Sequence, residues 1–322
     1  MPDTSLLCLG VTWFLSSALL STYANTAFLI AFGDPLAHTL VRFAGSACVG
    51  LATNAHAKKD RLSIADLGRL LREFRVPALC LLLANGMNSV ALQASGITLC
   101  YVVKSTIPFF TVLLMSFAFS ERYGVLIYLS LVPIVGGAAL ASLSDSSFSM
   151  VGLGAALCST VAQTLLNVSS KQAVRRCNVT GQQAQMVMAT ACAIACFPLY
   201  MLYGAWAGTD PVFSSALVAA LRGDVTPLGL AALAALAYHS EYLLNFVFIE
   251  KVAPLAFSVT DIARRVAIIG CGAVMFQKPL FPINMIGIAI ALAGVLWYSL
   301  LNQRNKKSLQ PRRSSLFGSP SL

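Results

Sequence analysis

The sequence predicts an all-α membrane protein of ten transmembrane helices, arranged as two inverted repeats of five helices. Its composition supports the class, because 57% of the 322 residues are hydrophobic and only 11% are charged. A soluble domain carries about 25% charged residues. At ~20 residues per span with short links, a chain of this length holds about ten helices. We expect no separate soluble domain in the remainder.

Apolar runs bounded by turn and charge signals define the spans in order along the chain. The first run, 6–32, has no basic region before it and is too long for the apolar part of a signal peptide, so we expect a span there. Very short links at 33–35 and 250–254 imply antiparallel neighbouring helices. The expected spans are 6–31, 35–54, 76–95, 97–119, 123–143, 149–170, 182–205, 226–249, 254–276 and 281–301.

Lysine and arginine are distributed unevenly between the two ends of these spans. One end holds 16 of the 22 basic residues, the other end holds only Arg222 and Lys278, and four fall within spans. Basic residues collect on the cytosolic side of membrane proteins, so we expect an even number of spans with both termini in the cytosol. This bias explains the net charge of +10, which is therefore not an indication of nucleic-acid binding.

A faint internal repeat divides the chain. Glu121-Arg122 and the glycine pair 136–137 match Gln277-Lys278 and residues 293–294, at an offset near 157. Five spans per repeat is an odd number, so the repeats must insert with opposite topology, as in many carriers. We expect one membrane domain over 1–302, with repeat one at about 1–146 and repeat two at about 147–302. A disordered, basic cytosolic tail is expected over 303–322.

The polar link 55–75 has apolar residues on one side of a helical projection. It is expected to form a short amphipathic helix on the membrane surface.

Six charged side chains fall within the expected spans, although a charge at bilayer depth costs at least ~2.5–3.5 kcal/mol on insertion scales. They carry a net charge of +2, with Arg42, Lys104, Arg264 and Arg265 set against Glu241 and Asp261. An empty cavity between the repeats would hold uncompensated positive charge. We expect it to bind a small dianion such as a phosphate ester, because guanidinium forks and a lysine point charge both suit phosphate oxygens.

Three cations are the first candidates for binding this anion. Lys104 lies near the middle of its span, where a ligand role is favoured over snorkelling. Arg264 and Arg265 project about 100° apart on one helix. We expect one or both of them to bind the anion; if only one does, the other pairs with Asp261, one turn away.

Further polar residues are candidates of several kinds. Glu241, with Tyr242 beside it, is a proton site, an organiser of the arginines or a plain salt-bridge partner. Asn85 and Asn88 could hydrogen-bond either a ligand or a neighbouring helix. Arg42 lies close to the start of its helix and is expected to be structural or to snorkel.

Other function classes find no support in the residues. The nine cysteines are scattered without metal-site spacing, and we expect them to be packing residues, with no metal and no cofactor. The chain has no nucleophile–base constellation and no glycine-rich phosphate loop, and its three histidines are far apart in the sequence. We therefore expect that the protein is not an enzyme.

Three stretches resemble the triose-phosphate translocator family of the drug/metabolite transporter superfamily. In YVVKSTIPFFTVLLMSFAFSERYGVLIYLSLVPIVGGAALAS, as in the family, a lysine precedes xxxPxF and a glutamate ends the span. VAPLAFSVTDIARRVAIIGCGAVMFQKPLFPINMIGIAIALAGVLWYS is similar to the final block, in which a Lys-Arg pair follows SVxNxxK. GLGAALCSTVAQTLLNVSSKQAV resembles the sixth helix.

The resemblance implies an antiporter that exchanges a phosphorylated three-, five- or six-carbon compound for inorganic phosphate by alternating access. The family's phosphate-binding lysine falls on Lys104, and its Lys-Arg pair falls on the two arginines of the ninth span. It also implies an organelle membrane, either a plastid-type envelope or the Golgi or endoplasmic reticulum. The oligomeric state is left open.

The resemblance extends to further positions, at several of which this chain carries another residue than the family. The family's helix-3 threonine and histidine fall on Asn88 and Asn85, and its substrate-contacting tyrosine falls on Glu241. A family lysine is Arg264 here, and a family asparagine is Asp261. The two added carboxylates could bind sugar hydroxyls, neutralise an arginine or couple a proton.

These departures keep three alternatives open. A nucleotide-sugar transporter of the same superfamily would need room for a base and a diphosphate. A proton-coupled solute carrier would use Glu241 or Asp261. A non-transporting receptor or scaffold would tolerate the loss of Lys104.

Overall fold

The computed structural model describes residues 4–56, 62–118, 123–143, 148–207, 221–251, 254–277 and 281–316, together with Ser120 and Ala219. Within these ranges all regular secondary structure is helical, which confirms the all-α prediction. Six of the described helices are long and apolar enough to cross a membrane. The elements are α1 Thr4–Leu15, η1 Ser16–Ser21, α2 Thr22–Phe32, α3 Pro35–His56, α4 Ile64–Glu73, α5 Arg75–Lys104, α6 Ile107–Ala118, α7 Val125–Leu143, α8 Met150–Cys177, α9 Gly181–Ala207, α11 Thr226–Lys251, α12 Pro254–Met275 and α13 Pro282–Leu316.

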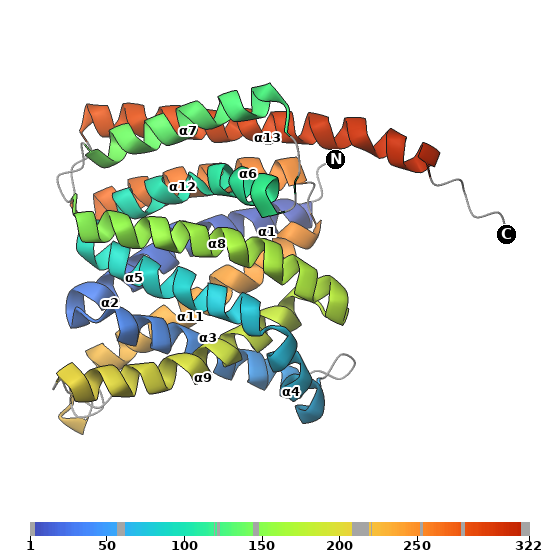
Figure 1. Cartoon of the computed structure of the whole chain (residues 1–322). Coiled ribbons are helices and arrows are strands. Elements are labelled where there is room, and N and C mark those ends of the chain that lie inside the picture. The colour runs from blue at the N-terminus through green and yellow to red at the C-terminus, as the bar shows by residue number, and fades with distance from the viewer. Residues whose placement is uncertain are drawn as a thin grey trace.

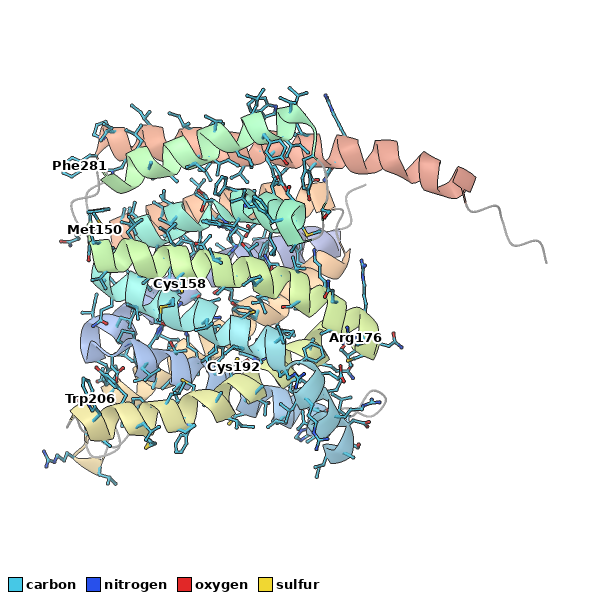
Figure 2. The ribbon with its side chains drawn as sticks, viewed as in Figure 1. Met150, Cys158, Arg176, Cys192, Trp206 and Phe281 are labelled. Atoms are coloured by element: carbon cyan, nitrogen blue, oxygen red, sulfur yellow. The ribbon has the colours of Figure 1, made fainter. Side chains whose placement is uncertain are left out.

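The long helices lie side by side along one direction and form a bundle (Figure 1). Helix α1 begins, and α13 leaves the bundle, at the same end, where the short helix α4 also lies. Arg176 is at this end, whereas Met150, Trp206 and Phe281 are at the opposite end (Figure 2). Several basic residues of the sequence analysis, namely Lys58, Lys59, Arg61, Arg122 and Lys278, lie outside the described residues.

Two expected spans contain interruptions. The first is continuous from α1 to α2, but six residues in its middle, η1, form a π-helical segment. The fourth is broken after Lys104, where Ser105 and Thr106 bond back to carbonyls of the preceding turn, both at 2.6 Å. Such side-chain bonds compete with the helix ladder, and Pro108 has no N–H to continue it. The break leaves Lys104 at the end of α5.

Helix α5 joins the third expected span to the start of the fourth across Gly96. This residue has φ 75° and ψ −171°, a conformation that favours glycine, and it separates the two helical parts.

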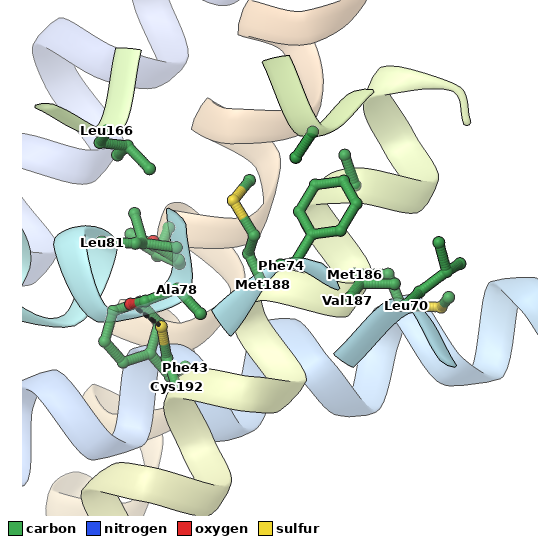
Figure 3. Close-up of a cluster of buried hydrophobic side chains, with 13 residues drawn as sticks. Phe43, Leu70, Phe74, Ala78, Leu81, Leu166, Met186, Val187, Met188 and Cys192 are labelled. Carbon is green, nitrogen blue, oxygen red and sulfur yellow. Dashed lines mark hydrogen bonds between the residues drawn. The ribbon is translucent and has the colours of Figure 1, made fainter. Parts of the chain in front are cut away.

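The amphipathic helix expected in the link 55–75 is present as α4. Its N-cap Ser63 accepts a hydrogen bond from the Asp66 N–H at 3.1 Å. Leu70 and, just after the helix, Phe74 are fully buried among residues of α3, α5 and α9 (Figure 3). This apolar contact fixes α4 against the end of the bundle.

Helix α13 differs from the sequence expectation at its end. It continues to Leu316 and extends beyond the bundle (Figure 1), whereas a disordered tail is expected from residue 303. A helix that is already formed in a span extends without a new nucleation step, and Lys, Gln, Arg and Leu are good helix formers. Residues 317–322 lie outside the described part.

Candidate functional site

Both arginines of α12 bind the same carboxylate. Arg264 donates from Nε and Nη2 to Oδ1 of Asp261 at 3.0 and 2.7 Å. Arg265 donates from Nε to Oδ2 of Asp261 at 3.0 Å. Spacings of three and four residues bring these groups to one side of the helix. Pairing with Asp261 is therefore shared by both arginines and is not confined to one of them.

A second carboxylate reaches the cluster from α11. Glu241 Oε1 accepts from Arg264 Nη1 at 2.9 Å, and the two side chains are 18% and 13% exposed. Ser17 and Ser21, one at each end of the π-helical segment, donate to Oε1 and Oε2 of Glu241 at 2.8 and 2.5 Å. Of the three roles considered for Glu241, this geometry fits both the organiser of an arginine and the plain salt-bridge partner. Single π-helical turns are frequent at functional sites.

Lys104 joins the cluster through its backbone. Its carbonyl accepts from Arg265 Nη1 at 2.7 Å, so the break in the fourth span supplies an acceptor that an unbroken helix would use internally. Its Nζ lies over the ring of Tyr101, 5.8 Å from the centroid. Within the part of the chain that the structure describes, this ammonium forms no ion pair.

A buried aromatic ring lies over the guanidinium group of Arg264. Its guanidinium carbon is 5.1 Å from the ring centre of Trp13, and Trp13 packs on Phe248 at 5.2 Å between centroids. A cation over an indole face is stabilised by the ring quadrupole.

Asn85 and Arg42 belong to a second buried cluster, between α3 and α5, and Asn88 is buried further along α5. Arg42 Nη2 donates to Oδ1 of Asn85 at 3.4 Å and to Ser89 at 3.3 Å. Oδ1 of Asn88 accepts from the thiol of Cys100 at 3.0 Å. Of the two expectations for Arg42, the structural role fits its burial and the snorkelling one does not, because the residue is only 3% exposed.

Tyr242 is connected to this second cluster by the ring of Tyr238, which lies between Tyr242 and Arg42. Its ring is 4.5 Å from that of Tyr238, and Tyr238 in turn lies 5.0 Å from the guanidinium carbon of Arg42. Arg42 thus has an amide, a hydroxyl and an aromatic face around it, whereas the two arginines of α12 have carboxylates.

A chain of hydrogen bonds joins the two clusters. It runs from Glu241 through Ser21, Asn25, His38 and Ser89 to Arg42, with distances of 2.5, 3.0, 3.0, 3.0 and 3.3 Å. The four connecting residues are all buried. A polar path through the bundle therefore links the carboxylate of α11 to the cation of α3.

The connecting residues were not among the sequence candidates, although one signal pointed to them. Ser17, Ser21 and Asn25 recur every fourth residue, which places them on one face of a helix. His38 follows shortly after, at the start of the next span. A polar stripe on an otherwise apolar span indicates a buried polar neighbour.

The cluster on α12 is largely neutralised by its own carboxylates. Lys104, Arg264 and Arg265 stand against Asp261 and Glu241, which leaves a net charge of +1, and both arginines are paired. This differs from the expectation of an uncompensated cationic cavity. An incoming anion would have to compete with carboxylates for the guanidinium groups.

The fold and this site define an integral membrane protein of carrier type: a bundle of apolar helices around buried, paired charges. A family model described as the Triose-phosphate Transporter family matches residues 4–299. The chain belongs to this family, as its sequence motifs predict.

Named relatives are similar along most of the chain. Phosphoenolpyruvate/phosphate translocator 1, chloroplastic, of Oryza sativa subsp. japonica is 29% identical and covers 92% of this chain and 71% of its own length. The triose phosphate/phosphate translocator, non-green plastid, chloroplastic, of Brassica oleracea var. botrytis is 28% identical over 92% of this chain and 72% of that protein. Glucose-6-phosphate/phosphate translocator 2, chloroplastic, of Arabidopsis thaliana is 27% identical over 91% and 74%.

A solved crystal structure shares the fold. It matches 93% of this chain and 97% of its own chain with a TM-score of 0.51, at 17% sequence identity.

Proposed function

We propose that this protein is an antiporter that exchanges a phosphorylated small metabolite for inorganic phosphate. The observation that carries the proposal is the meeting of Arg264, Arg265 and Lys104 at a break in a span, inside an apolar bundle. Guanidinium pairs bind phosphate oxygens in bidentate fashion, and an ammonium without an ion pair adds a point charge. The proposed cargo is triose phosphate, phosphoenolpyruvate or another sugar phosphate, in line with the names of the relatives.

In the proposed transport cycle, the two carboxylates bind the arginines whenever no anion is bound. In the empty carrier, Glu241 and Asp261 occupy the guanidinium groups. An arriving phosphate ester takes over Nη1 of Arg264 and the ammonium of Lys104, and Glu241 is then held by its serine donors alone. Loss of the bond between α11 and α12 frees these helices to move, and alternating access follows. Chemical catalysis has no part in this cycle.

A ten-helix layout of two inverted repeats underlies the proposed cycle. The packing of α7 on α13 supports it, because a Cβ on Gly137 would meet the backbone of Ala291, and a Cβ on Gly294 would meet the backbone of Ile134. Gly137 and Gly294 are 157 residues apart, and so are Ile134 and Ala291. The same contact therefore recurs with the two repeats exchanged, at the offset found in the sequence.

The proposed setting is an organelle membrane, either a plastid-type envelope or the Golgi or endoplasmic reticulum, with both termini in the cytosol. Arg72, Arg75, Arg175 and Arg176 support this orientation, because they lie on α4, at the start of α5 and at the end of α8, and basic residues favour the cytosolic side.

Reconstitution tests the proposal directly. The purified protein is placed in liposomes preloaded with phosphate, triose phosphate, phosphoenolpyruvate, hexose phosphate, a UDP-sugar or nothing, and uptake of labelled phosphate is measured. Uptake only into vesicles that hold a phosphorylated counter-substrate supports exchange and ranks the cargo. No uptake under any preload would falsify exchange, and competition by the UDP-sugar would favour a nucleotide-sugar transporter.

A second candidate is a proton-coupled solute carrier, which the hydrogen-bonded path from Glu241 to His38 favours. This path contains two titratable groups joined by hydroxyl and amide side chains. In the same liposomes, proton coupling predicts uptake driven by a pH gradient without any counter-substrate, and loss of that uptake in Glu241→Gln. Uptake that ignores the gradient excludes it.

A further inference from the structure

A basic cavity lies at the end of the bundle, away from the candidate transport site. It has a volume of about 440 Å³, within the ~300–1,000 Å³ range of small-molecule sites. The end of α4 and the start of α5 line one side with Arg72, Glu73 and Arg75, and the last turns of α8 line the other with Gln172 and Arg176. Three arginines and one glutamate give the cavity a net charge of +2.

The arginines of this cavity are available to an anion. Arg176 pairs with Glu73 at 3.7 Å, with side chains that are 75% and 44% exposed, and such an exposed pair contributes little free energy. Among the described residues, Arg72 and Arg75 form no ion pair. Arg69, one turn earlier on α4, differs because it pairs with Asp66 and lies outside the cavity.

An apolar cavity of about 280 Å³ lies further along α8, between α8 and α6. It is lined by Phe110, Leu113, Leu114, Phe117, Ala118, Val161, Thr164 and Leu165. On α8, Leu165 is one turn from Ser169 of the basic cavity and two turns from Gln172. Val161, Leu165, Gln172 and Arg176 project within about 60° of one another on α8.

One face of α8 therefore carries a basic cavity with room for a phosphate headgroup near the end of the bundle, and an apolar cavity about 10 Å further along the helix. A free anion would use only the first, and a neutral apolar molecule only the second. An anionic phospholipid matches both. We propose that this protein binds an anionic phospholipid along α8, with the phosphate held by Arg72, Arg75 and Arg176 and an acyl chain between α6 and α8.

This lipid would connect α4, α5, α6 and α8 from the outer surface of the bundle. Basic cavities at the cytosolic ends of spans suit the negative leaflet of a membrane, and each Lys or Arg near that surface contributes about 1 kcal/mol of attraction. The site shares no residue with the cluster on α12. Its occupancy and the exchange activity can therefore be measured separately.

The test compares lipid binding by two matched double variants of the full-length purified protein. Native mass spectrometry in detergent measures binding of phosphatidylglycerol, of phosphatidylcholine with the same acyl chains, and of inorganic phosphate. R72Q/R75Q removes two charges from the cavity. R69Q/R175Q removes two exposed charges from the same end of the bundle, outside the cavity, and melting temperatures in detergent check that both variants are folded.

We expect phosphatidylglycerol to bind wild type and R69Q/R175Q equally, and R72Q/R75Q at least about tenfold more weakly. Leu165→Trp, which fills the apolar cavity, should weaken phosphatidylglycerol binding. The preference for phosphatidylglycerol over phosphatidylcholine should stay the same. Equal binding of phosphatidylcholine, or equal loss in both double variants, would overturn the proposal. Inorganic phosphate that binds wild type as tightly as the lipid but fails to bind R72Q/R75Q would assign the cavity to a free anion.

Discussion

Glu241 of α11 accepts a hydrogen bond from Nη1 of Arg264 on α12 at 2.9 Å, inside the bundle. The ion pair joins two neighbouring helices of the chain, α11 and α12, through their buried charges. Under the proposed function, a carboxylate that occupies Arg264 leaves the site nearly neutral when no anion is bound. It also makes the carrier's affinity for anions depend on how readily the carboxylate is displaced.

Neutralising Glu241 should tighten anion binding. Glu241→Gln keeps the size of the side chain and one of the two oxygens to which Ser17 and Ser21 donate, and it raises the net charge of the cluster by one. We expect the KM for phosphate to fall about tenfold, which corresponds to ~1.4 kcal/mol. The maximal exchange rate should fall as well, because a tightly held anion leaves slowly.

Initial rates of phosphate exchange in liposomes, measured across phosphate concentrations, give both parameters. Asp66→Asn is the matched control, because it removes one exposed carboxylate on α4 and should leave both values unchanged. An unchanged or higher KM in Glu241→Gln would show that Glu241 does not compete with the anion.

Loss of the Lys104 ammonium should impair exchange without damaging the fold. Lys104 forms no ion pair among the described residues, so Lys104→Gln leaves no described carboxylate unpaired. A hydrogen bond to a charged group contributes about 1.5–3 kcal/mol, so we expect a loss of about 10- to 100-fold in kcat/KM for phosphate.

Exchange kinetics and the melting temperature in detergent are measured on the same preparations. Arg175→Gln, an exposed residue at the end of α8, serves as the control for loss of one positive charge. Full exchange by Lys104→Gln would remove this residue from the site. A matching fall in melting temperature would assign it a structural role instead.

The sequence predicts the helical class and the main charged residues of the site for a physical reason. Apolar length identifies a span whatever its neighbours are, and a charge such as Arg264 within a span must have a partner. Arg264 and Arg265 stand three and four residues after Asp261, and helix geometry alone brings side chains at these spacings together. These inferences need only the local chain.

The remaining features of the site depend on which helices pack against each other, and the local sequence does not show this. Nothing local shows that Ser17 and Ser21 of the first span face Glu241, more than 200 residues later. For Arg42 the distance from the helix start cannot decide between a structural role and snorkelling, because its burial follows from the packing of α3 against α5, α9 and α11. The compensation of charge at the site is likewise a long-range property.

The serine donors should act through Glu241. Ser21 donates to Oε2 of Glu241 and accepts from Asn25, so Ser21→Ala leaves a partly buried carboxylate oxygen without this donor. We expect kcat/KM for phosphate to change about threefold to tenfold. In a Ser21→Ala, Glu241→Gln double variant the two effects should not add, with an interaction free energy of at least ~0.5 kcal/mol.

Exchange kinetics of the wild type, both single variants and the double variant give this double-mutant cycle and its interaction free energy. Ser16→Ala is the control within the same π-helical turn, because Ser16 contacts Ser240 and not Glu241. Additive effects of Ser21 and Glu241 would mean that the serine acts elsewhere, for instance through the path to His38.

Replacement by alanine should affect protein stability differently at two neighbouring glycines of α7, Gly136 and Gly137. A Cβ on Gly137 would meet backbone atoms of Ala291 and Gly287 on α13, which cannot move aside as a flexible side chain would, whereas a Cβ on Gly136 would enter open space. Close backbone approach at small residues is the usual basis of helix pairing in membranes. Gly137→Ala should therefore destabilise the protein by ~1–3 kcal/mol, and Gly136→Ala should be neutral or slightly stabilising, because alanine is the better helix former.

Melting temperatures of the purified variants in one detergent measure the contrast, and Gly294→Ala extends it to the second repeat. Gly294 packs on Ile134 as Gly137 packs on Ala291, so an inverted repeat predicts a loss for Gly294→Ala similar to that for Gly137→Ala. If Gly136→Ala lowered the melting temperature as much as Gly137→Ala, the loss would come from the helix itself. If only one of the two repeat positions were sensitive, the correspondence at an offset of 157 residues would not describe the packing of α7 on α13. Equal losses of melting temperature in Gly137→Ala and Gly294→Ala would show that the repeat seen in the sequence corresponds to the packing contact between α7 and α13.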